Sequence, residues 1–431
     1  MKVGHLIRAE RIRQKMKQVV LARGICTPSY LSKIERNLIF PSEEIVTLLF
    51  NKLNVDVNML QGNDQNTENE FEKILKASYK DVIFKKDKIF TEQQLHFLEE
   101  QTSLFENQSL YYTYQLITLR FRLILGGDMD ERKQEIDDIG KMSKQFDYFQ
   151  TYLYNVNQGL YYYTTKKIKK ALEHLEDCLP SLDTIGLEKW EIAEFDYILG
   201  VIYTADDRIF NSIDYIRRAL EYFRENLLMK RVLECYILIG VTQKRSEQFQ
   251  EALDSYLKAE QICEEFNFHN EKEMVYHNLG SLYGTMGNSV EGFYFLKKSL
   301  LYQVDNRSKL LTILSLVAEY SKIKEKNLVN HWCDKGLLFF SELDDESLNS
   351  YYYHFTLYKS LHSKQGLSDT FAQKSIDHFE KLQDYQHVHK YSIALAELYF
   401  TQRKYKLSSI YYQKANRYGY IYRKIEKWED V

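Results

Sequence analysis

The sequence predicts an all-α protein in which a small N-terminal helical domain is followed by a long array of helical hairpins. The 431 residues include only 3 Pro and 17 Gly, so long uninterrupted helices are permitted. No alternating strand pattern of useful length occurs beyond residue 70. Small residues also recur at a fixed period of 40 or 41 residues, which is typical of a repeat array, at Gly159, Gly200, Gly240 and Gly280.

The first helix of the N-terminal domain is expected to begin near Val3. Apolar residues recur from there at helical spacing and alternate with basic residues, which predicts an amphipathic helix with a basic outer face. The basic residues are Arg8, Arg11, Arg13, Lys15 and Lys17. A second, short helix is expected from about Gln18 to Ala22, and Gly24 supplies the turn after it.

The third helix is expected over residues 29–35, with Thr27 as its cap and Pro28 at its opening. Leu31 and Ile34 are spaced to face inward, which leaves the polar residues of this helix outward. Residues 42–53 predict one more helix, so this domain is expected to occupy residues 1–60.

Charge is unevenly distributed along the chain. Residues 1–52 carry ten Lys or Arg and four Asp or Glu, whereas the remaining 379 residues carry 48 basic and 57 acidic residues. We refer to the N-terminal domain, residues 1–60, as the head. A basic head attached to an acidic remainder is expected when only the head binds a polyanion.

The head resembles the Cro/C1-type helix-turn-helix. The matching residues are Gly4, Ile7, Arg8, Arg11, Gln18, Leu21, Ala22, Gly24, the run from Tyr30 to Arg36, Pro41, Leu48, Leu53 and Val55. The sequence departs from the family at Lys17, where Thr is usual, and at Pro28, where many members carry a base-reading polar residue.

This resemblance implies double-stranded DNA as a partner. It places Gln18 at a backbone phosphate and Ser29, Tyr30, Lys33 and Arg36 near the bases. Lys33 is the expected base contact, since a lysine there could meet guanine O6 and N7. The alternative is that Lys33 is a solvated helix residue.

Residues 61–70 are polar and are expected to form a linker, and residues 71–431 are expected to form the repeats. The four periodic glycines lie in patterns that resemble the tetratricopeptide repeat, as in Leu199-Gly200-x-x-Tyr203 with Ala219. Small residues let the two helices of a hairpin approach closely. The resemblance implies a right-handed superhelix with a concave wall made by the first helix of each pair.

Register within the repeats predicts which side chains face the concave groove. The candidates for binding a peptide are Asn157, Tyr197, Glu234, Met274, His277, Asn278 and Ser315. An asparagine amide both donates and accepts, so Asn157 and Asn278 could hold a peptide backbone. The alternative is that Asn278 forms hydrogen bonds only within the array and binds no peptide.

A repressor-type head followed by such repeats resembles the peptide-responsive regulators of Gram-positive bacteria, the NprR, PlcR, PrgX and Rap group. The resemblance implies a quorum-sensing transcription regulator, dimeric on DNA, in which a short oligopeptide in the groove changes DNA binding. Two alternatives stay open. One is a Rap-like protein that sequesters or dephosphorylates a response regulator through residues 71–146, and the other is a phage lysis–lysogeny arbitrator.

Other classes lack sequence support. Catalytic and nucleotide-binding motifs are absent, so neither an enzyme nor a cofactor is expected. The five cysteines are dispersed and predict neither disulfides nor a metal site, and the acidic cluster after Gly126 is expected to be a turn and helix cap. No apolar stretch predicts a signal peptide or membrane span, so a cytoplasmic location is expected.

Overall fold

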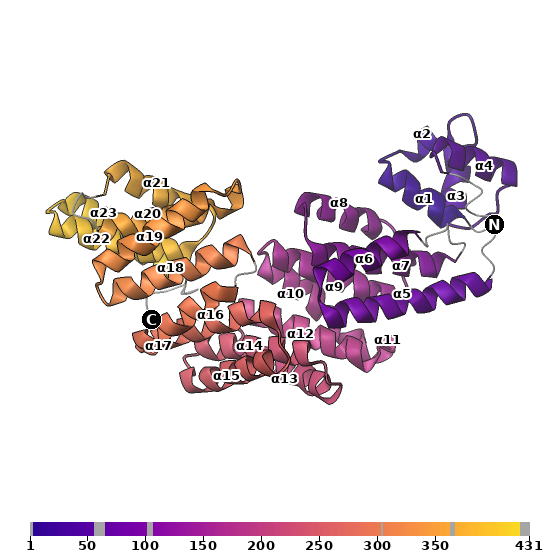
Figure 1. Ribbon diagram of the computed structural model, residues 1–431. Helices are drawn as coiled ribbons and strands as arrows, with labels where there is room; N and C mark the ends of the chain where they lie inside the picture. The colour runs from indigo at the N-terminus through magenta and orange to yellow at the C-terminus, as the bar shows by residue number, and fades with distance from the viewer. Residues whose placement is uncertain (1–2, 56–64, 101–106, 303–304, 363–366, 423–431) are drawn as a thin grey trace. The chain divides into compact units, whose positions relative to one another are not determined.

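The computed structural model describes residues 3–55, 65–100, 107–302, 305–362 and 367–422, and within these ranges every regular element is helical (Figure 1). The all-α prediction is therefore confirmed. Contacts divide the chain into two compact units, Met1–Ser246 and Glu247–Val431. The division expected from the sequence, a head at 1–60 and repeats at 71–431, stays a prediction.

The first unit contains the head and the first repeats. Its elements are α1 (Gly4–Arg13), α2 (Gln18–Ala22), α3 (Pro28–Glu35), α4 (Glu43–Lys52), α5 (Gln65–Lys85), α6 (Lys88–Glu100), α7 (Gln108–Leu125), α8 (Met129–Gly140), η2 (Ser143–Gln145), α9 (Tyr148–Thr164), α10 (Ile168–Glu176), η3 (Leu179–Ser181), α11 (Leu182–Ile185), α12 (Lys189–Ala205), α13 (Ile209–Glu225) and α14 (Met229–Arg245). Residues 61–64 of the expected linker lie outside the described residues. The rest of it is helical, because α5 begins at Gln65.

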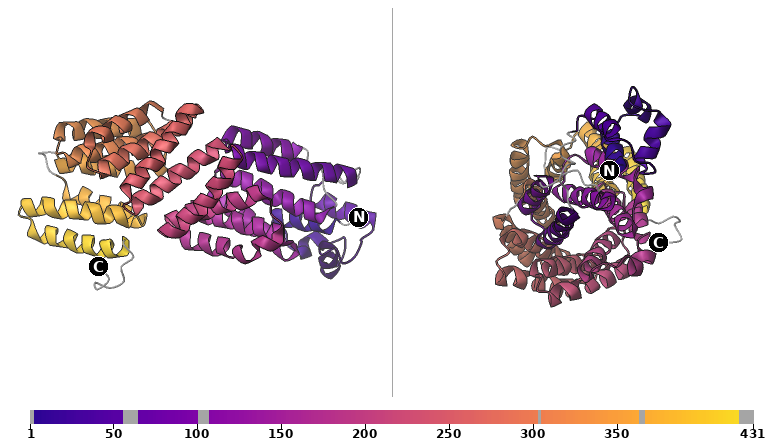
Figure 2. Two further views of the ribbon diagram at one scale, coloured as in Figure 1. Left: turned by 90° about the horizontal axis from the view of Figure 1, so that it is seen from below. Right: turned by 90° about the vertical axis from the view of Figure 1, so that its right-hand side faces the viewer.

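The second unit continues the array. Its elements are α15 (Phe249–Glu265), α16 (His269–Thr285), α17 (Ser289–Ser299), η4 (Leu300–Tyr302), α18 (Asn306–Lys322), α19 (Lys326–Ser341), η5 (Glu346–Leu348), α20 (Asn349–His362), α21 (Asp369–Lys381), α22 (Tyr385–Thr401) and α23 (Tyr405–Tyr422). In both units consecutive helices pack side by side, for example α12 on α13 and α22 on α23 (Figure 2).

A strict alternation of helix and turn explains the 40-residue period. Each helix from α12 to α16 has 17 residues and is followed by three residues before the next helix. The middle residue of each turn has a positive φ, which reverses the chain within one residue; these residues are Asp207, Leu227, Glu247, Asn267 and Gly287. The repeat is longer than the usual tetratricopeptide unit because its helices are longer.

Glycine at the periodic positions permits close packing within a hairpin. A Cβ added at Gly200 would lie 2.4 Å from Cγ1 of Ile216, and one added at Gly280 would lie 2.7 Å from Cγ of Leu296. Both partners lie on the second helix of the hairpin. The predicted role of the small residues is confirmed at these positions.

The head has its own apolar core, in which Leu31 and Ile34 are fully buried as predicted. Thr27 caps α3 by accepting a hydrogen bond from the backbone N–H of Tyr30 at 3.2 Å, and Pro28 occupies the first turn. The basic outer face expected for α1 is wrong at Arg11. Its guanidinium turns inward and holds the buried carboxylate of Glu35.

Candidate functional site

A cavity of about 450 Å³ opens among the inner helices of the first unit. It is lined by residues of α5, α6, α7, α9, α12 and α14, together with Lys86 between α5 and α6. Tyr197 and Glu234, two residues predicted to bind a peptide, both line it. Apolar side chains make up much of the remaining wall, including Leu123, Ile124, Leu160, Ile198 and Val201.

Charged side chains form a continuous network along this cavity. Arg120 donates from Nη2 to Oε1 of Glu194 at 3.1 Å, and Arg231 also pairs with Glu194. Arg231 donates from Nη1 to Oε2 of Glu234 at 2.8 Å, and Nζ of Lys86 lies 3.0 Å from the same oxygen. Three cations thus share two carboxylates, which leaves one positive charge in excess.

Burial makes this network energetically demanding, since Arg231 is fully buried and Glu194 is 4% exposed. Burial alone would raise the pKa of Glu234, but the positive charges of Lys86 and Arg231 outweigh it and lower that pKa. Burial and the nearby Arg231 charge lower the pKa of Lys86. The ring of Tyr197 is contacted by two cations, with Nζ of Lys86 and Cζ of Arg231 each 4.3 Å from its centroid.

Asn157 is placed differently from the expectation. It is 1% exposed, and its Nδ2 donates to the backbone carbonyl of Leu116 at 2.9 Å. Its amide therefore joins α9 to α7 inside the unit and does not face the groove. The repeat register predicts on which side of α9 the Asn157 side chain lies, but α7 covers that position.

The remaining predicted peptide contacts lie in the second unit. Asn278 is half-buried and donates from Nδ2 to the carbonyl of Met274, one turn earlier on α16, at 2.9 Å. His277 bonds through Nδ1 to Oγ1 of Thr312 at 3.0 Å, and Ser315 donates to the carbonyl of Leu311 at 3.0 Å. The structure brings these residues onto two packed helices, α16 and α18.

Sequence reasoning missed a cavity of about 460 Å³ within the second unit. It is lined by α18, α20 and α22 and includes Lys322, Tyr358, His362, Lys390 and Glu397. The available signal was Ala318, a small residue on α18 that lines the cavity.

The predicted DNA contacts gather on the head. Ser29, Lys33 and Arg36 are exposed and Tyr30 is half-buried. Gln18 donates from Nε2 to Oε2 of Glu35 at 2.7 Å, so its amide nitrogen is engaged within the head.

The head packs against the repeats, a contact that no local pattern in the sequence predicts. His5 is fully buried, and its ring centroid lies 5.6 Å from that of Tyr111 and 6.3 Å from that of Tyr112 on α7. Asn37 donates from Nδ2 to Oε1 of Gln108 at 3.0 Å. A second apolar patch on α1, formed by Ala9 and Ile12 and also buried, was the available signal.

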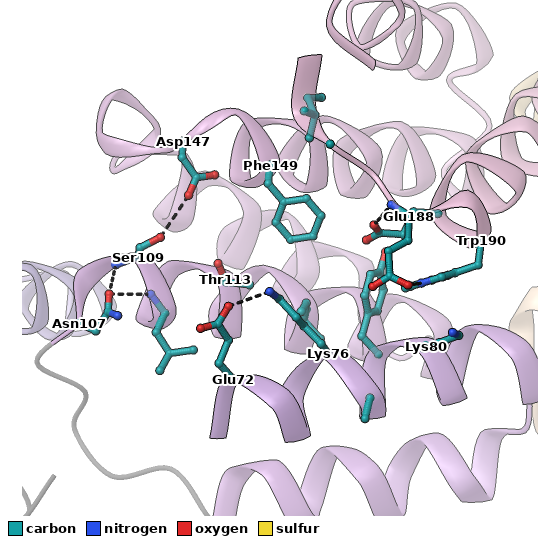
Figure 3. Close-up of a pocket in the computed structure, with 17 residues that line it drawn as sticks. Glu72, Lys76, Lys80, Asn107, Ser109, Thr113, Asp147, Phe149, Glu188 and Trp190 are labelled. Carbon is teal, nitrogen blue, oxygen red and sulfur yellow. Dashed lines mark hydrogen bonds and ion pairs between the residues drawn. The ribbon is translucent and has the colours of Figure 1, made fainter. Parts of the chain in front are cut away.

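A further cavity, of about 510 Å³, lies among α5, α7, α9 and the start of α12 (Figure 3). Its wall combines the aromatic rings of Phe149 and Trp190 with polar side chains. The Trp190 indole donates to Oε2 of Glu188 at 3.0 Å. None of the predicted site residues lines this cavity.

Two other expectations concern metals and membranes. Asp128 caps α8 by accepting a hydrogen bond from the backbone N–H of Asp130 at 2.9 Å, so the acidic cluster after Gly126 acts as a turn and cap. Among the described residues no cluster of His, Cys, Asp and Glu is suited to hold a metal ion, and none of the described helices is long and apolar enough to cross a bilayer.

Comparison with known proteins agrees with this architecture. The family model described as Helix-turn-helix matches residues 7–60. The transcriptional activator NprA of Geobacillus stearothermophilus is 30% identical over 410 residues, which cover 92% of this chain and 98% of NprA. The chain belongs to the NprA/NprR family of transcription regulators.

One solved structure and one further sequence relative are also similar to this chain. The crystal structure of NprR in complex with its cognate peptide NprX has a TM-score of 0.58 and 20% identity, covering 81% of this chain and 98% of that one. Response regulator aspartate phosphatase I of Bacillus subtilis is 22% identical over 77% of this chain and 85% of its own length. NprA/NprR family membership makes the chain a transcription regulator with an N-terminal helix-turn-helix.

Proposed function

We propose that this regulator binds double-stranded DNA through its head and a short signalling oligopeptide in the groove of its repeats, and that the peptide changes DNA binding. The peptide complex of NprR, which has the same fold, supports a peptide as the ligand. The helix-turn-helix and its basic charge support DNA as the partner.

One observation supports coupling between peptide binding and DNA binding. A single helix, α7, extends from the cavity beside Tyr197 to the head. Gln108 and Tyr112 near its start contact the docked head. Arg120, Leu123 and Ile124 near its end line the cavity of about 450 Å³ that also contains Tyr197 and Glu234. Because an α-helix moves as a nearly rigid rod, a ligand that displaces Arg120 also shifts the surface that holds the head.

The cavity suits one end or one acidic side chain of a peptide. Its apolar wall can take aliphatic side chains, and the excess positive charge among Arg120, Arg231 and Lys86 attracts a carboxylate. A carboxylate there would restore the balance of charge in the network. Asn278 in the second unit stays a candidate for holding peptide backbone.

The proposal is tested by the affinity of the purified protein for duplexes from the region upstream of its own gene. Titrations are run with and without synthetic peptides that match the C-terminal residues of any small secreted reading frame next to that gene. A peptide that binds the protein is expected to change DNA affinity. Binding without any change in DNA affinity would contradict the allosteric part of the proposal.

We further propose that the protein works as a homodimer in the cytoplasm and has no catalytic activity of its own. Two heads on a dimer can meet half-sites about one helical turn of DNA apart. Light scattering during size-exclusion chromatography, with and without DNA, measures the oligomeric state. A strictly monomeric protein in the DNA complex would contradict the dimer.

A Rap-like role is the second candidate, favoured by the similarity to response regulator aspartate phosphatase I. The polar cavity beside Trp190 offers a surface for a partner on the repeats near residues 71–146 (Figure 3). Mixing the protein with a phosphorylated response regulator and following its phosphate tests this role. Unchanged phosphate and no complex would exclude it for that regulator.

A further inference from the structure

A strongly basic cavity of about 620 Å³ lies at the seam between the head and α8. Residues of both parts line it. The residues from the head are Arg8, Arg11, Ile12, Lys15, Met16, Lys17, Gln18, Ser32, Glu35 and Arg36, and those from the repeats are Gln134 and Lys141. Six of these twelve side chains are cationic, and a single one is a carboxylate.

Most of this positive charge is not neutralised within the cavity. The carboxylate of Glu35 is held by Arg11, with Nε to Oε1 at 2.5 Å and Nη2 to Oε2 at 2.9 Å. Lys15, Lys17 and Arg36 form no ion pair with any carboxylate in the described part of the chain, and all three are exposed. The cavity therefore carries a surplus of cations and suits an anion.

The position of the cavity indicates that the anion it binds is a phosphate of the DNA backbone. Gln18 and Arg36, two residues predicted to contact DNA, line it. Lys17 and Gln18 stand at the start of α2, the helix that lies against the phosphate backbone in a helix-turn-helix bound to DNA. A DNA strand seated on the head thus brings its phosphates to this cavity.

The docked repeats add donors at the same place. Lys141 follows the last turn of α8, and its backbone carbonyl accepts a hydrogen bond from Nη2 of Arg8 at 2.5 Å, which fixes it beside the head. Its side chain is 53% exposed and Nζ donates to Oδ1 of Asp138 at 2.6 Å. An ammonium group has three N–H donors, so Lys141 can keep Asp138 and still donate to a phosphate.

We propose that this cavity holds a phosphate of the DNA backbone, and that Lys141 and Gln134 of the repeats contact it from outside the helix-turn-helix. The inference rests on the proposed DNA binding and extends it. The DNA-binding surface then includes α8, and its strength depends on the docking of the head.

A random-sequence duplex is a sufficient probe, because a phosphate contact does not depend on base sequence. Fluorescence anisotropy measures the affinity of the full chain for this duplex over a range of salt concentrations. Lys141→Gln is expected to weaken binding by about threefold to tenfold at low salt and to reduce the salt slope by about 0.9, the loss of one phosphate contact. Gln134→Ala is expected to weaken binding less.

Lys133→Gln is the matched control. Lys133 lies on the same helix and pairs with Asp137 at 2.5 Å, but it does not line the cavity. Thermal unfolding checks that both variants fold as the parent does. Loss in Lys141→Gln alone supports the proposal, whereas no loss, or an equal loss in both variants, overturns it.

Two further outcomes are separable. Calorimetry with inorganic phosphate alone tests a free-anion site, and phosphate binding that needs Lys141 while DNA affinity does not would overturn the proposal. If the parent protein binds no duplex at all, the proposed DNA binding fails and this inference fails with it. If the parent binds DNA and Lys141→Gln binds equally well, only this inference fails.

Discussion

Arg231 and Glu194 form an ion pair between α14 and α12 in which the arginine side chain is 0% exposed and the glutamate side chain 5% exposed. Glu194 also accepts a hydrogen bond from Arg120 on α7. Glu194 therefore contacts two buried guanidinium groups from two different helices, and Arg231 has Glu234 as a second carboxylate partner.

Glu194→Gln is expected to lower the free energy of unfolding by about 3–5 kcal/mol, because it removes the carboxylate that pairs with buried Arg120 and leaves Arg231 with Glu234 alone. Urea unfolding followed by circular dichroism measures the change. Asp214→Asn is the control, because it breaks an ion pair on the surface. In this pair the Arg218 side chain is 58% exposed and the Asp214 side chain 60% exposed. The control should change stability by less than about 1 kcal/mol, and an equally small effect at Glu194 would contradict the network.

Lys33→Ala is expected to reduce sequence discrimination by the head. The cognate duplex is first selected by the protein from a random library, and affinities are then measured for it and for a scrambled duplex. The cognate complex should lose about 1–3 kcal/mol and the scrambled one less. Equal losses on both would show that Lys33 contacts only the backbone or nothing.

Gly200→Ala is expected to destabilise the first unit by about 1–3 kcal/mol through overpacking against Ile216, although alanine favours helices. A second substitution, Ile216→Ala, makes room for the added methyl group. The double variant should be more stable than the sum of the two single effects predicts. Strict additivity would contradict the close contact.

Stability of the second unit is expected to fall as the pH drops below about 6.5. Burial, and then the nearby His387, hold the pKa of His354 well below its ordinary value. Between the lowered pKa of His354 in the folded state and its ordinary pKa in the unfolded state, the folded state binds fewer protons than the unfolded state. Acid therefore favours unfolding in this range. Charged and titratable groups facing His354 from the neighbouring helices and turn are His378, Asp384, His387 and Lys390.

His354→Gln should flatten this pH dependence between pH 7 and pH 5, as measured by urea unfolding at each pH. His96→Gln, which changes an exposed histidine of the first unit, should leave it as in the parent. An unchanged slope in His354→Gln would show that other groups cause the acid sensitivity. The substitution also removes the bond between Nδ1 of His354 and the hydroxyl of Tyr391, so stability at pH 8 is compared as well.

The helical elements of the head and the glycine period of the repeats could be predicted because both depend on local patterns. Thr27 and Pro28 mark a helix start in any context, and Gly200 marks a close helix pair. The charge network could not be predicted, because Lys86 and Glu234 are 148 residues apart in the sequence. No local pattern around either residue indicates that the two form a pair. The docking of His5 and the burial of Asn157 likewise depend on which helices meet in space.

The central claim, that α7 couples the groove to the head, is tested most directly by Gln108→Ala, which removes the contact with Asn37. DNA affinity is measured with and without a peptide that binds the parent protein, and Gln261→Ala, at an exposed position of α15, serves as the control. We predict that Gln108→Ala keeps its peptide affinity but loses most of the peptide's effect on DNA binding, while the control keeps both. A peptide effect of the same size in Gln108→Ala and in the parent protein would contradict the claim.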